Sequence, residues 1–371
     1  MKLFMVWVTG VINQLVTWVI RPRNLGIAVL SRSTLVLTAA LAGGFTLEVK
    51  GAGFVEALKF STAEGAPAFL LALVTYAGLI GWVIGLALVI GAYWRESKEA
   101  AAGPVLVAEM RGLVDTADQP LLKAVPVALS GRREDCLIDV RAYLTGVPPN
   151  VTSALDEISH LRRQVRRARG DTARENVKVV AGGVMQVPLL VYAGTQLDDE
   201  GKVTLLEWER TSGQWKQLLE PDDLSRFDVS GLIDATGAAE VVVAVSASYK
   251  VDFDGIAETF AGKPVVHLGL PEPKVNGLWS EENQVALTHQ FLQTLGTLAN
   301  AGVKTVYLVL AAPATLALRF GMAYDPRNMP DLLCYQRERG NTPPFPWSVQ
   351  MPTDSKPVAY IPTVVAEVAM A

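Results

Sequence analysis

The sequence has few of the residues that catalysis and metal binding require. Its 371 residues include two cysteines, Cys136 and Cys334, and three histidines, His160, His267 and His289. Neither cysteine has a partner at metal-binding or redox spacing, and no histidine stands beside a nucleophile or at ligand spacing. A G-x-S-x-G elbow, a Walker A loop, an H-E-x-x-H pair and a complete G-x-G-x-x-G loop are all absent. We therefore expect a protein that is not an enzyme, with no catalytic residue, no metal ion and no cofactor.

Charge is also sparse. Charged residues make up 19% of the chain, and the net charge of −4 argues against binding to DNA or RNA polymers. Half of the residues are hydrophobic and the mean hydropathy is +0.28, which is high for a soluble enzyme, so we expect part of the surface to face lipid. Two isolated cysteines fit a reduced, cytosolic compartment for the main body.

The longest uncharged stretch covers residues 65–94 and exceeds the roughly 20 residues that cross a bilayer. It ends in Tyr93 and Trp94, where an aromatic belt is expected, so a span is predicted over 66–94. A buried helix of a soluble core is the alternative. A second span is predicted over 27–47, provided that Arg32 reaches the membrane interface.

The first twenty residues are also apolar, and they predict an interfacial amphipathic helix over 3–20, with a third span as the alternative. Basic residues flank the spans on one side, whereas the loop over 48–64 mixes both signs of charge. This bias predicts a multi-pass membrane protein whose C-terminal body is cytoplasmic. The membrane region then covers 1–96 and is followed by a linker over 97–103.

The body over 104–371 alternates strand-like and helical segments, which is the pattern of an α/β sheet. Apolar runs at 240–245, 265–270 and 305–310 are typical of buried strands, and 281–301 predicts a long helix between two of them. The second half is Rossmann-like in outline. In such sheets ligands bind where the strands end at their carboxyl edge.

The body also repeats itself at an offset of 127 positions. Gly194 corresponds to Gly321, Trp208 to Tyr335 and Arg210 to Arg337. Each copy reads as a strand, a proline-marked helix start, an apolar helix closed by this glycine, and a strand that ends aromatic-x-Arg. We therefore expect two lobes, 104–235 and 236–371, related by a pseudo-twofold axis with a shared cleft, although chance similarity of two helix-and-strand units stays open.

Polar and aromatic residues follow the predicted strand ends in both lobes. Aromatic faces can stack on bases, and guanidinium groups can bind phosphates through two hydrogen bonds. Each arginine taken alone also fits a surface salt bridge, and each aromatic residue a core contact. The candidate ligand-binding residues are Met185, Gln186, Trp208, Arg210, Ser246, Ser248, Tyr249, Lys250, Pro313, Thr315, Tyr335 and Arg337.

Several segments resemble SAVED domains. The first half of such a domain is matched by 180–190, 207–210 and Trp215, and the second half by 267–271, 307–321 and 335–337. The most specific part is the A-A-P-A helix start at 311–314 with the downstream Y-x-R strand, and the resemblance covers about 104–360. The first copy departs from the second because Gln186 stands where Pro313 does, which puts equal ligand contacts from the two lobes in doubt.

The resemblance implies two fused CARF-like lobes that sense a cyclic oligonucleotide in bacterial CBASS anti-phage defence. With the membrane segments, the whole resembles a two-transmembrane SAVED effector whose functional partner is a cGAS/DncV-like nucleotidyltransferase. A cyclic trinucleotide is expected to drive self-association into filaments or arrays, which disrupt the inner membrane and arrest growth. The alternatives are a membrane-anchored ring nuclease that uses Lys250, and a tethered regulator that signals to another protein.

Overall fold

The structure is a computed structural model that describes residues 25–41, 46–49, 58–61, 68–101, 103–146, 149–198 and 201–362. The chain divides into two compact units, 1–101 and 102–371, and each is described by itself. The interfacial helix predicted over 3–20 lies outside the described residues.

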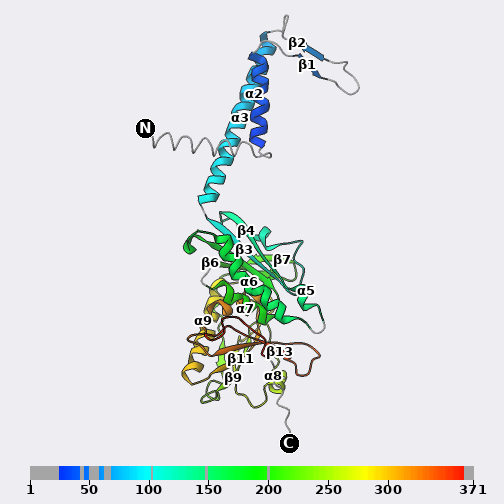
Figure 1. Cartoon of the computed structure of the whole chain (residues 1–371). Helices are drawn as coiled ribbons and strands as arrows, with labels where there is room; N and C mark the ends of the chain where they lie inside the picture. Colours follow the sequence, from blue (N-terminus) through cyan, green and yellow to red (C-terminus); the bar gives the residue numbers. More distant parts are fainter. Residues whose placement is uncertain are drawn as a thin grey trace. The chain divides into compact units, whose positions relative to one another are not determined.

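The N-terminal unit contains two helices, α2 (Leu25–Leu41) and α3 (Ala68–Ala101), which pack side by side (Figure 1). Between them in the chain, strands β1 (Thr46–Val49) and β2 (Leu58–Ser61) pair antiparallel. Within the described residues, α3 alone has a stretch long and apolar enough to cross a bilayer, Ala72–Arg95, with a mean hydropathy of 2.3.

The bounds of the two helices differ from the sequence expectation. Helix α2 ends at Leu41, so it is shorter than the span predicted over 27–47. Helix α3 runs on to Ala101, so most of the segment predicted as a linker over 97–103 is helical. Lys98 and Glu99 lie in a run of alanine and charged residues with good helix propensity, which favours the continuation.

Small residues let α2 and α3 approach closely. A Cβ atom added to Gly85 would lie 2.7 Å from the backbone N of Leu30, and one added to Gly26 would lie 3.0 Å from the backbone N of Val89. A Cβ at Gly81 would meet Ser33 Oγ. Glycines three and four residues apart on one face are the usual means of close helix packing in lipid, where hydrophobic burial does not drive association.

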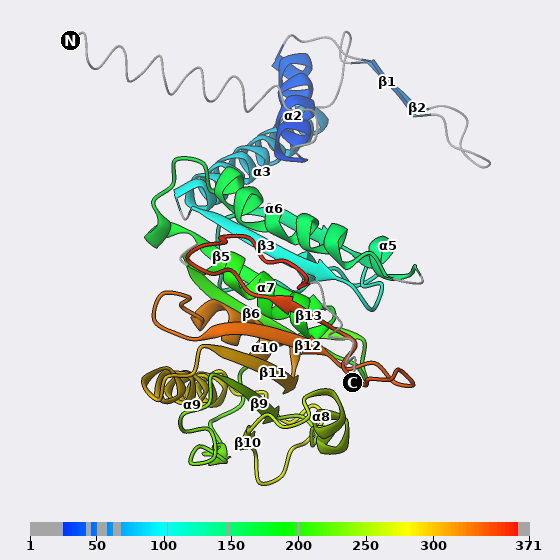
Figure 2. The same ribbon diagram turned by 60° about the horizontal axis from the view of Figure 1, so that its bottom comes forward.

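The second unit contains two sheets (Figure 2). The first sheet has the order β4-β3-β5-β6-β7, in which the first four strands are parallel and β7 is antiparallel. Its strands are β3 (Pro104–Arg111), β4 (Arg132–Asp139), β5 (Lys178–Val184), β6 (Lys202–Glu209) and β7 (Gln214–Gln217). Its helices are α4 (Leu121–Ala124), α5 (Arg141–Leu144), α6 (Val151–Arg169) and α7 (Val187–Leu197), with a 3₁₀ turn over Arg174–Asn176.

The second sheet has the order β13-β12-β11-β9-β10-β8, with parallel strands at its centre and an antiparallel strand at each edge. Its strands are β8 (Asp228–Ser230), β9 (Glu240–Ser246), β10 (Val265–Gly269), β11 (Thr305–Ala311), β12 (Asp331–Gln336) and β13 (Trp347–Gln350). Its helices are α8 (Phe253–Thr259), α9 (Glu281–Asn300) and α10 (Ala314–Ala323).

The two sheets share one topology. Without β8, the second sheet reads β10-β9-β11-β12-β13, which matches β4-β3-β5-β6-β7 strand for strand. Strand β5 starts at residue 178 and β11 at residue 305, and 305 − 178 gives the offset of 127 seen in the sequence. The repeat therefore reflects a duplicated fold. Because β8 joins the second sheet, that sheet begins before residue 236, where the second lobe was predicted to start.

Helices α7 and α10 cross where the two halves meet. Gly194 and Gly321, which the sequence predicted to close these helices, lie within them. A Cβ atom at Gly194 would meet Leu318 O and would lie 2.9 Å from the Cα of Gly321. A Cβ atom at Gly321 would meet Val191 O and would lie 3.0 Å from the Cα of Gly194. The two sets of contacts correspond under the 127-residue offset, so the predicted pseudo-twofold axis passes between these glycines.

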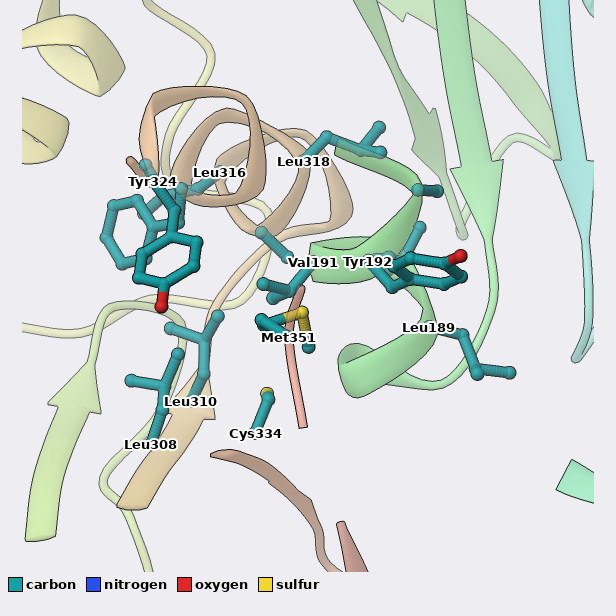
Figure 3. Close-up of a cluster of buried hydrophobic side chains, with 14 of the residues drawn as sticks. Leu189, Val191, Tyr192, Leu308, Leu310, Leu316, Leu318, Tyr324, Cys334 and Met351 are labelled. Atoms are coloured by element: carbon teal, nitrogen blue, oxygen red, sulfur yellow. The ribbon is translucent and has the colours of Figure 1, made fainter. Parts of the chain in front are cut away.

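The main hydrophobic cluster is continuous across both halves. Each helix of the crossing also contacts the opposite sheet, since α10 packs on β5 and β6 while α7 packs on β12 and β13. Figure 3 shows side chains from α7, α10 and the second sheet, including Val191, Leu318 and Met351, gathered in one buried cluster. The two lobes thus form one body with a shared core.

Candidate functional site

A pocket of about 430 Å³ lies at the carboxyl edge of the second sheet. The loop after β9, the last residues of β11 and β12, and the β12–β13 hairpin form its wall, and one residue of α7 in the first lobe completes it. The lining residues are Val187, Tyr249, Lys250, Val251, Asp252, Val309, Leu310, Ala311, Tyr335, Gln336, Arg337, Arg339 and Phe345. The pocket is therefore where a Rossmann-like sheet binds its ligand.

The charged residues of the pocket give it a positive excess. It holds the cations Lys250, Arg337 and Arg339 and one anion, Asp252. Arg337 donates from Nε and Nη2 to Asp252 Oδ2 at 3.0 and 2.8 Å. Lys250 and Arg339 form no ion pair with any described residue. Two cationic side chains are thus available to an anionic ligand.

Asp252 has a structural role besides its ion pair. Its Oδ1 atom accepts a hydrogen bond from the backbone N–H of Gly255 at 3.0 Å, which caps the start of α8. This backbone hydrogen bond, followed by the Arg337 guanidinium, holds the pKa of Asp252 below its usual value. The carboxylate therefore stays charged at neutral pH, and a ligand phosphate must compete with it for Arg337.

Two tyrosines supply aromatic surface. Tyr249 is 54% exposed, so its ring is available for stacking. Tyr335 is half-buried, and its ring packs edge-on against Phe260 with a centroid distance of 4.8 Å. Burial raises the pKa of the Tyr335 hydroxyl, which stays protonated. An exposed aromatic ring beside free cations suits a ligand that has both bases and phosphates.

The structure places four of the twelve candidate residues at this pocket, namely Tyr249, Lys250, Tyr335 and Arg337. The sequence indicated Tyr249 and Lys250 because they follow a predicted strand. It indicated Tyr335 and Arg337 because they belong to the aromatic-x-Arg repeat.

Four other candidates from the second lobe lie inside the fold. Ser246 Oγ is hydrogen-bonded to His267 Nε2 at 2.9 Å, and it also accepts the Val251 N–H at 3.2 Å. Ser248 is buried, and its backbone N–H donates to Ala311 O at 2.8 Å.

Thr315 and Pro313 lie at the start of α10, where the two lobes meet. Thr315 is fully buried, and its N–H and hydroxyl donate to Glu207 Oε2 of the first lobe at 2.8 and 2.6 Å. Pro313 is the N-cap residue of α10. Burial raises the pKa of Glu207, against the effect of the Thr315 hydrogen bonds. Thr315 thus joins the two lobes, and neither residue lines the pocket.

The candidates of the first lobe are not among the lining residues, although Gln186 directly precedes Val187, which is one of them. Met185 is buried in the core, and Gln186 is the N-cap residue of α7. Trp208 packs edge-on against Trp215 with a centroid distance of 5.1 Å. Arg210 is exposed and is not among the lining residues. The structure therefore does not bring the two sets of candidates together.

The difference between the lobes has a clear cause in the cross-strand register. Trp208 stands opposite Trp215 in the first lobe, whereas Tyr335 stands opposite the much smaller Ser348 in the second. The Trp215 indole lies over Gly182, where an added Cβ would be 2.7 Å from the ring, and it donates to Gln119 O at 3.0 Å. Trp215 therefore fills the edge that stays hollow in the second lobe.

Charges at this edge of the first lobe are paired internally. Buried Glu109 accepts hydrogen bonds from Arg111 Nε at 2.7 Å, from the backbone N–H of Leu121 at 2.8 Å and from the Thr116 hydroxyl. Arg141 contacts the carboxylates of Asp115 and Asp139, each at 2.7 Å. These groups stabilise the first lobe and are not available to a ligand.

Sequence reasoning missed several lining residues, of which Asp252 and Arg339 matter most. Asp252 lies two residues beyond Lys250, and its position before a short helix was a signal for an N-cap. Arg339 lies in the β12–β13 hairpin, which the sequence pattern did not reveal. Val187 comes from the other lobe, and only the crossing of α7 and α10 brings it there.

A second pocket of about 240 Å³ lies beside the β9–β10 edge and includes Asp223, Glu272 and Lys274. Its charges are mixed, so it is a weaker candidate for an anion. Among the described residues, no group of three or more histidine, cysteine or acidic side chains could hold a metal ion.

The fold and the pocket define a class of protein, a duplicated Rossmann-like domain with a cationic pocket at one sheet edge and an apolar helical pair before it in the chain. Comparison with known families is specific. Residues 161–351 match the SAVED family, described as the SMODS-associated and fused to various effectors sensor domain. Residues 1–155 match the SAVED-fused 2TM effector domain. The chain therefore belongs to the SAVED family and has the 2TM effector arrangement, with a transmembrane N-terminal part.

Solved structures of similar proteins include the Acinetobacter baumannii Cap4 SAVED/CARF-domain containing receptor with the cyclic trinucleotide 3′3′3′-cAAA, at 10% identity and a TM-score of 0.46. The same receptor with 2′3′3′-cAAA gives 9% and 0.46, and the Moraxella osloensis Cap4 receptor gives 10% and 0.41. Each alignment covers 76% of this chain, and 60%, 60% and 58% of the respective receptor chains. No curated protein matches the sequence.

Proposed function

We propose that this chain is a membrane-anchored effector of CBASS anti-phage defence that binds a cyclic oligonucleotide in the pocket of its second lobe. The observation that carries the proposal is the set of residues at one strand edge: free Lys250 and Arg339, Arg337 held by a displaceable carboxylate, and exposed Tyr249. Cations bind phosphates and the tyrosine ring stacks on a base. Membership of a sensor-domain family supports the same ligand class.

A cyclic trinucleotide is the proposed ligand, rather than a dinucleotide. The pocket of about 430 Å³ lies at the smaller end of ligand sites, so it accommodates one part of the ring. The remainder extends over the rim formed by Tyr249 and Arg339. The two cyclic triadenylates seen with the Acinetobacter receptor are suitable first probes.

The proposed output is membrane disruption by assembly. Ligand binding favours a conformation that associates head to tail, and it can do so only through a higher affinity for the assembled form. Such heterologous contacts need not close into a ring, so filaments or arrays are expected. Assembly on the cytoplasmic side concentrates the transmembrane helices in the inner membrane, which stops growth of the infected cell. The signal is made by a cGAS/DncV-like nucleotidyltransferase.

Binding is tested by thermal shift on the full-length protein in detergent. The probes are 3′3′3′-cAAA, 2′3′3′-cAAA, cyclic di-AMP and linear triadenylate. A cyclic trinucleotide at 100 times its Kd should stabilise the fold by about 2.7 kcal/mol, whereas the linear control should not. A panel with no shift would contradict the sensor function. Chromatography of the recovered probe separates a sensor from a ring nuclease, because a sensor returns it intact.

Assembly and output are tested with the probe that binds. Light scattering of the detergent-solubilised protein should show particle growth on addition of the trinucleotide. Liposomes that contain only this protein should then become permeable to small ions, which a trapped ion-sensitive dye reports. Unchanged particle size at proven saturation would contradict assembly, and intact liposomes would indicate a tethered regulator that signals to another protein.

A further inference from the structure

The apolar part of the two described membrane helices contains one charge, Arg32, with no carboxylate in the surrounding sequence. Arg32 is the only charged residue of α2, and residues 68–94 of α3 have none. The sequence has no Asp or Glu at all in residues 1–47 or 65–94. An ionisable residue inside a membrane usually pairs with a partner or faces a water-filled cavity. A carboxylate partner from either stretch is excluded by composition.

The close contacts between the helices fix the depth of Arg32. Leu30 lies against Gly85 and Ser33 against Gly81, so Arg32 is level with residues 82–83 of the antiparallel helix. The apolar stretch of α3 runs from Ala72 to Arg95. At 1.5 Å per residue, Arg32 lies about 18 Å from the level of Arg95 and about 16 Å from that of Ala72. Both distances exceed the length of an arginine side chain, so the guanidinium does not reach either end of the apolar stretch.

Hydroxyl groups accompany Arg32 on α2. Ser31, Thr34 and Thr38 are exposed, and they follow one another at the three- and four-residue spacing of one helix side. Their hydroxyls donate to backbone carbonyls one turn earlier, at 3.1 Å for Ser31, 2.7 Å for Thr34 and 2.5 Å for Thr38. The helix therefore satisfies each hydroxyl proton, while the oxygen remains able to accept a hydrogen bond from outside.

The side of α2 that faces α3 is a different one. Gly26, Leu30, Ser33 and Leu37 make the close contacts with α3. At 100° per residue, Ser31 and Arg32 fall on the two flanks of the side turned away from α3, and Thr38 lies close to Ser31. Ser31, Arg32 and Thr38 thus point away from α3, with no described residue covering them, whereas Thr34 lies on the flank nearer to α3.

The two helices differ in how well they suit lipid. Helix α3 presents a long uncharged surface in which Leu73, Tyr76 and Ile80 are 52%, 66% and 60% exposed. Helix α2 has 17 residues, which span about 26 Å and fall short of a bilayer core of about 30 Å. Its exposed side contains Arg32 and the hydroxyls of Ser31 and Thr38, which flank Leu35, a residue that is 72% exposed. An assembly with α3 outside and α2 inside keeps the uncharged surface of α3 in lipid. It also gives Arg32 of α2 access to water.

We propose that the assembled membrane part is a water-filled, anion-conducting pore, lined by α2 from several copies of this chain with Arg32 and Ser31 facing the lumen. The proposal rests on the proposed ligand-driven assembly and specifies its output as a selective pore rather than general bilayer damage. A ring of arginines favours anions over cations in a pore. The lumen hydrates Arg32, which removes the cost of exposing a guanidinium to hydrocarbon.

The test is ion selectivity of the full-length protein in planar bilayers under a KCl gradient. Channels are formed with 3′3′3′-cAAA or 2′3′3′-cAAA, and in a second arm without probe at a high protein-to-lipid ratio, where mass action drives assembly. The ratio of chloride to potassium permeability should exceed one. It should fall to one or below in Arg32→Gln, be retained in Arg32→Lys, and stay at the wild-type value in Arg95→Gln, which removes a cation at the end of the span.

The possible failures are distinguishable. Currents that do not discriminate between the ions, with the same ratio in Arg32→Gln and wild type, would overturn the pore while leaving membrane disruption in place. Absence of current in both arms, with the protein shown to be inserted, would overturn membrane disruption and the pore together. Increased leakage of large dyes in Arg32→Gln would also contradict the pore, because loss of the lumen cation should not enlarge the lesion.

Discussion

Replacement of Gly321 by alanine should destabilise the second unit, because the crossing of α7 and α10 leaves no room for a side chain. A Cβ atom there would meet the carbonyl oxygen of Val191 and would lie 3.0 Å from the Cα of Gly194. Both obstacles are backbone atoms, so no rotamer change relieves the clash. The two helices must separate, and both sheets pack on them.

The magnitude follows from two opposing effects. Overpacking of a tight core costs about 1–3 kcal/mol, and the upper part of that range applies where backbone must move. Alanine in place of glycine inside a helix returns up to about 1 kcal/mol through helix propensity. The net loss is about 2 kcal/mol, which lowers the melting temperature of a unit of this size by about 3–4 °C.

The assay is thermal unfolding of the full-length protein in detergent, followed by circular dichroism. Gly296→Ala is the matched control, because Gly296 lies in α9 and a Cβ there has no atom within 4 Å. The control should gain up to about 1 kcal/mol. Gly194→Ala should lose about as much as Gly321→Ala, and the double variant less than the sum, because both affect one crossing. A Gly321→Ala protein as stable as the wild type would refute the described crossing.

Three further predictions concern the second lobe. Asp252→Asn keeps the cap of α8 but frees Arg337, so a cyclic trinucleotide should bind about fivefold tighter in equilibrium titration, from about 1 kcal/mol of lost competition. Asp254→Asn, next to the pocket, should change little, and weaker binding in Asp252→Asn would contradict competition. Tyr249→Ala should weaken binding about 5- to 100-fold through loss of 1–3 kcal/mol of stacking, with unchanged unfolding as the control; wild-type affinity would exclude the ring from the site. Burial lowers the pKa of His267 below 6.5, so the unfolded chain takes up the proton first and stability is lost as pH falls below 6.5. The melting temperature should therefore fall more between pH 7.5 and 5.5 in the wild type than in His267→Gln, and equal slopes would contradict this role.

Much of the fold could be predicted from the sequence, because its signals are local. The uncharged run at 65–94, the apolar strand 240–245 and the long helix near 281–301 all have patterns that depend on neighbouring residues. The 127-residue repeat also predicted the shared topology, because equivalent residues kept both spacing and type. Helix ends were less predictable, as the extension of α3 to Ala101 shows.

The site could be predicted only in part, because pocket formation depends on contacts between distant segments. The repeat predicted equivalent roles for Trp208 and Tyr335. The residue opposite each of them on the neighbouring strand, however, decides whether side chains fill that edge of the sheet. Trp215 and Ser348 belong to short strands with no strong pattern. Thr315 looked like a ligand-binding hydroxyl, but its partner Glu207 is 108 positions away in the other lobe. Sequence spacing alone does not reveal such pairs.

The most direct test of the sensor site compares the two arginines that the repeat makes equivalent. Arg337 lines the pocket of the second lobe, whereas Arg210 occupies the same position beside the filled edge of the first. Titration of the full-length protein with the cyclic triadenylate that binds should show a loss of at least tenfold in affinity for Arg337→Ala, since a charge-assisted hydrogen bond contributes about 1.5–3 kcal/mol. Arg210→Ala should bind as the wild type does. Equal losses in both variants, or a loss in Arg210→Ala alone, would contradict a binding site in the second lobe.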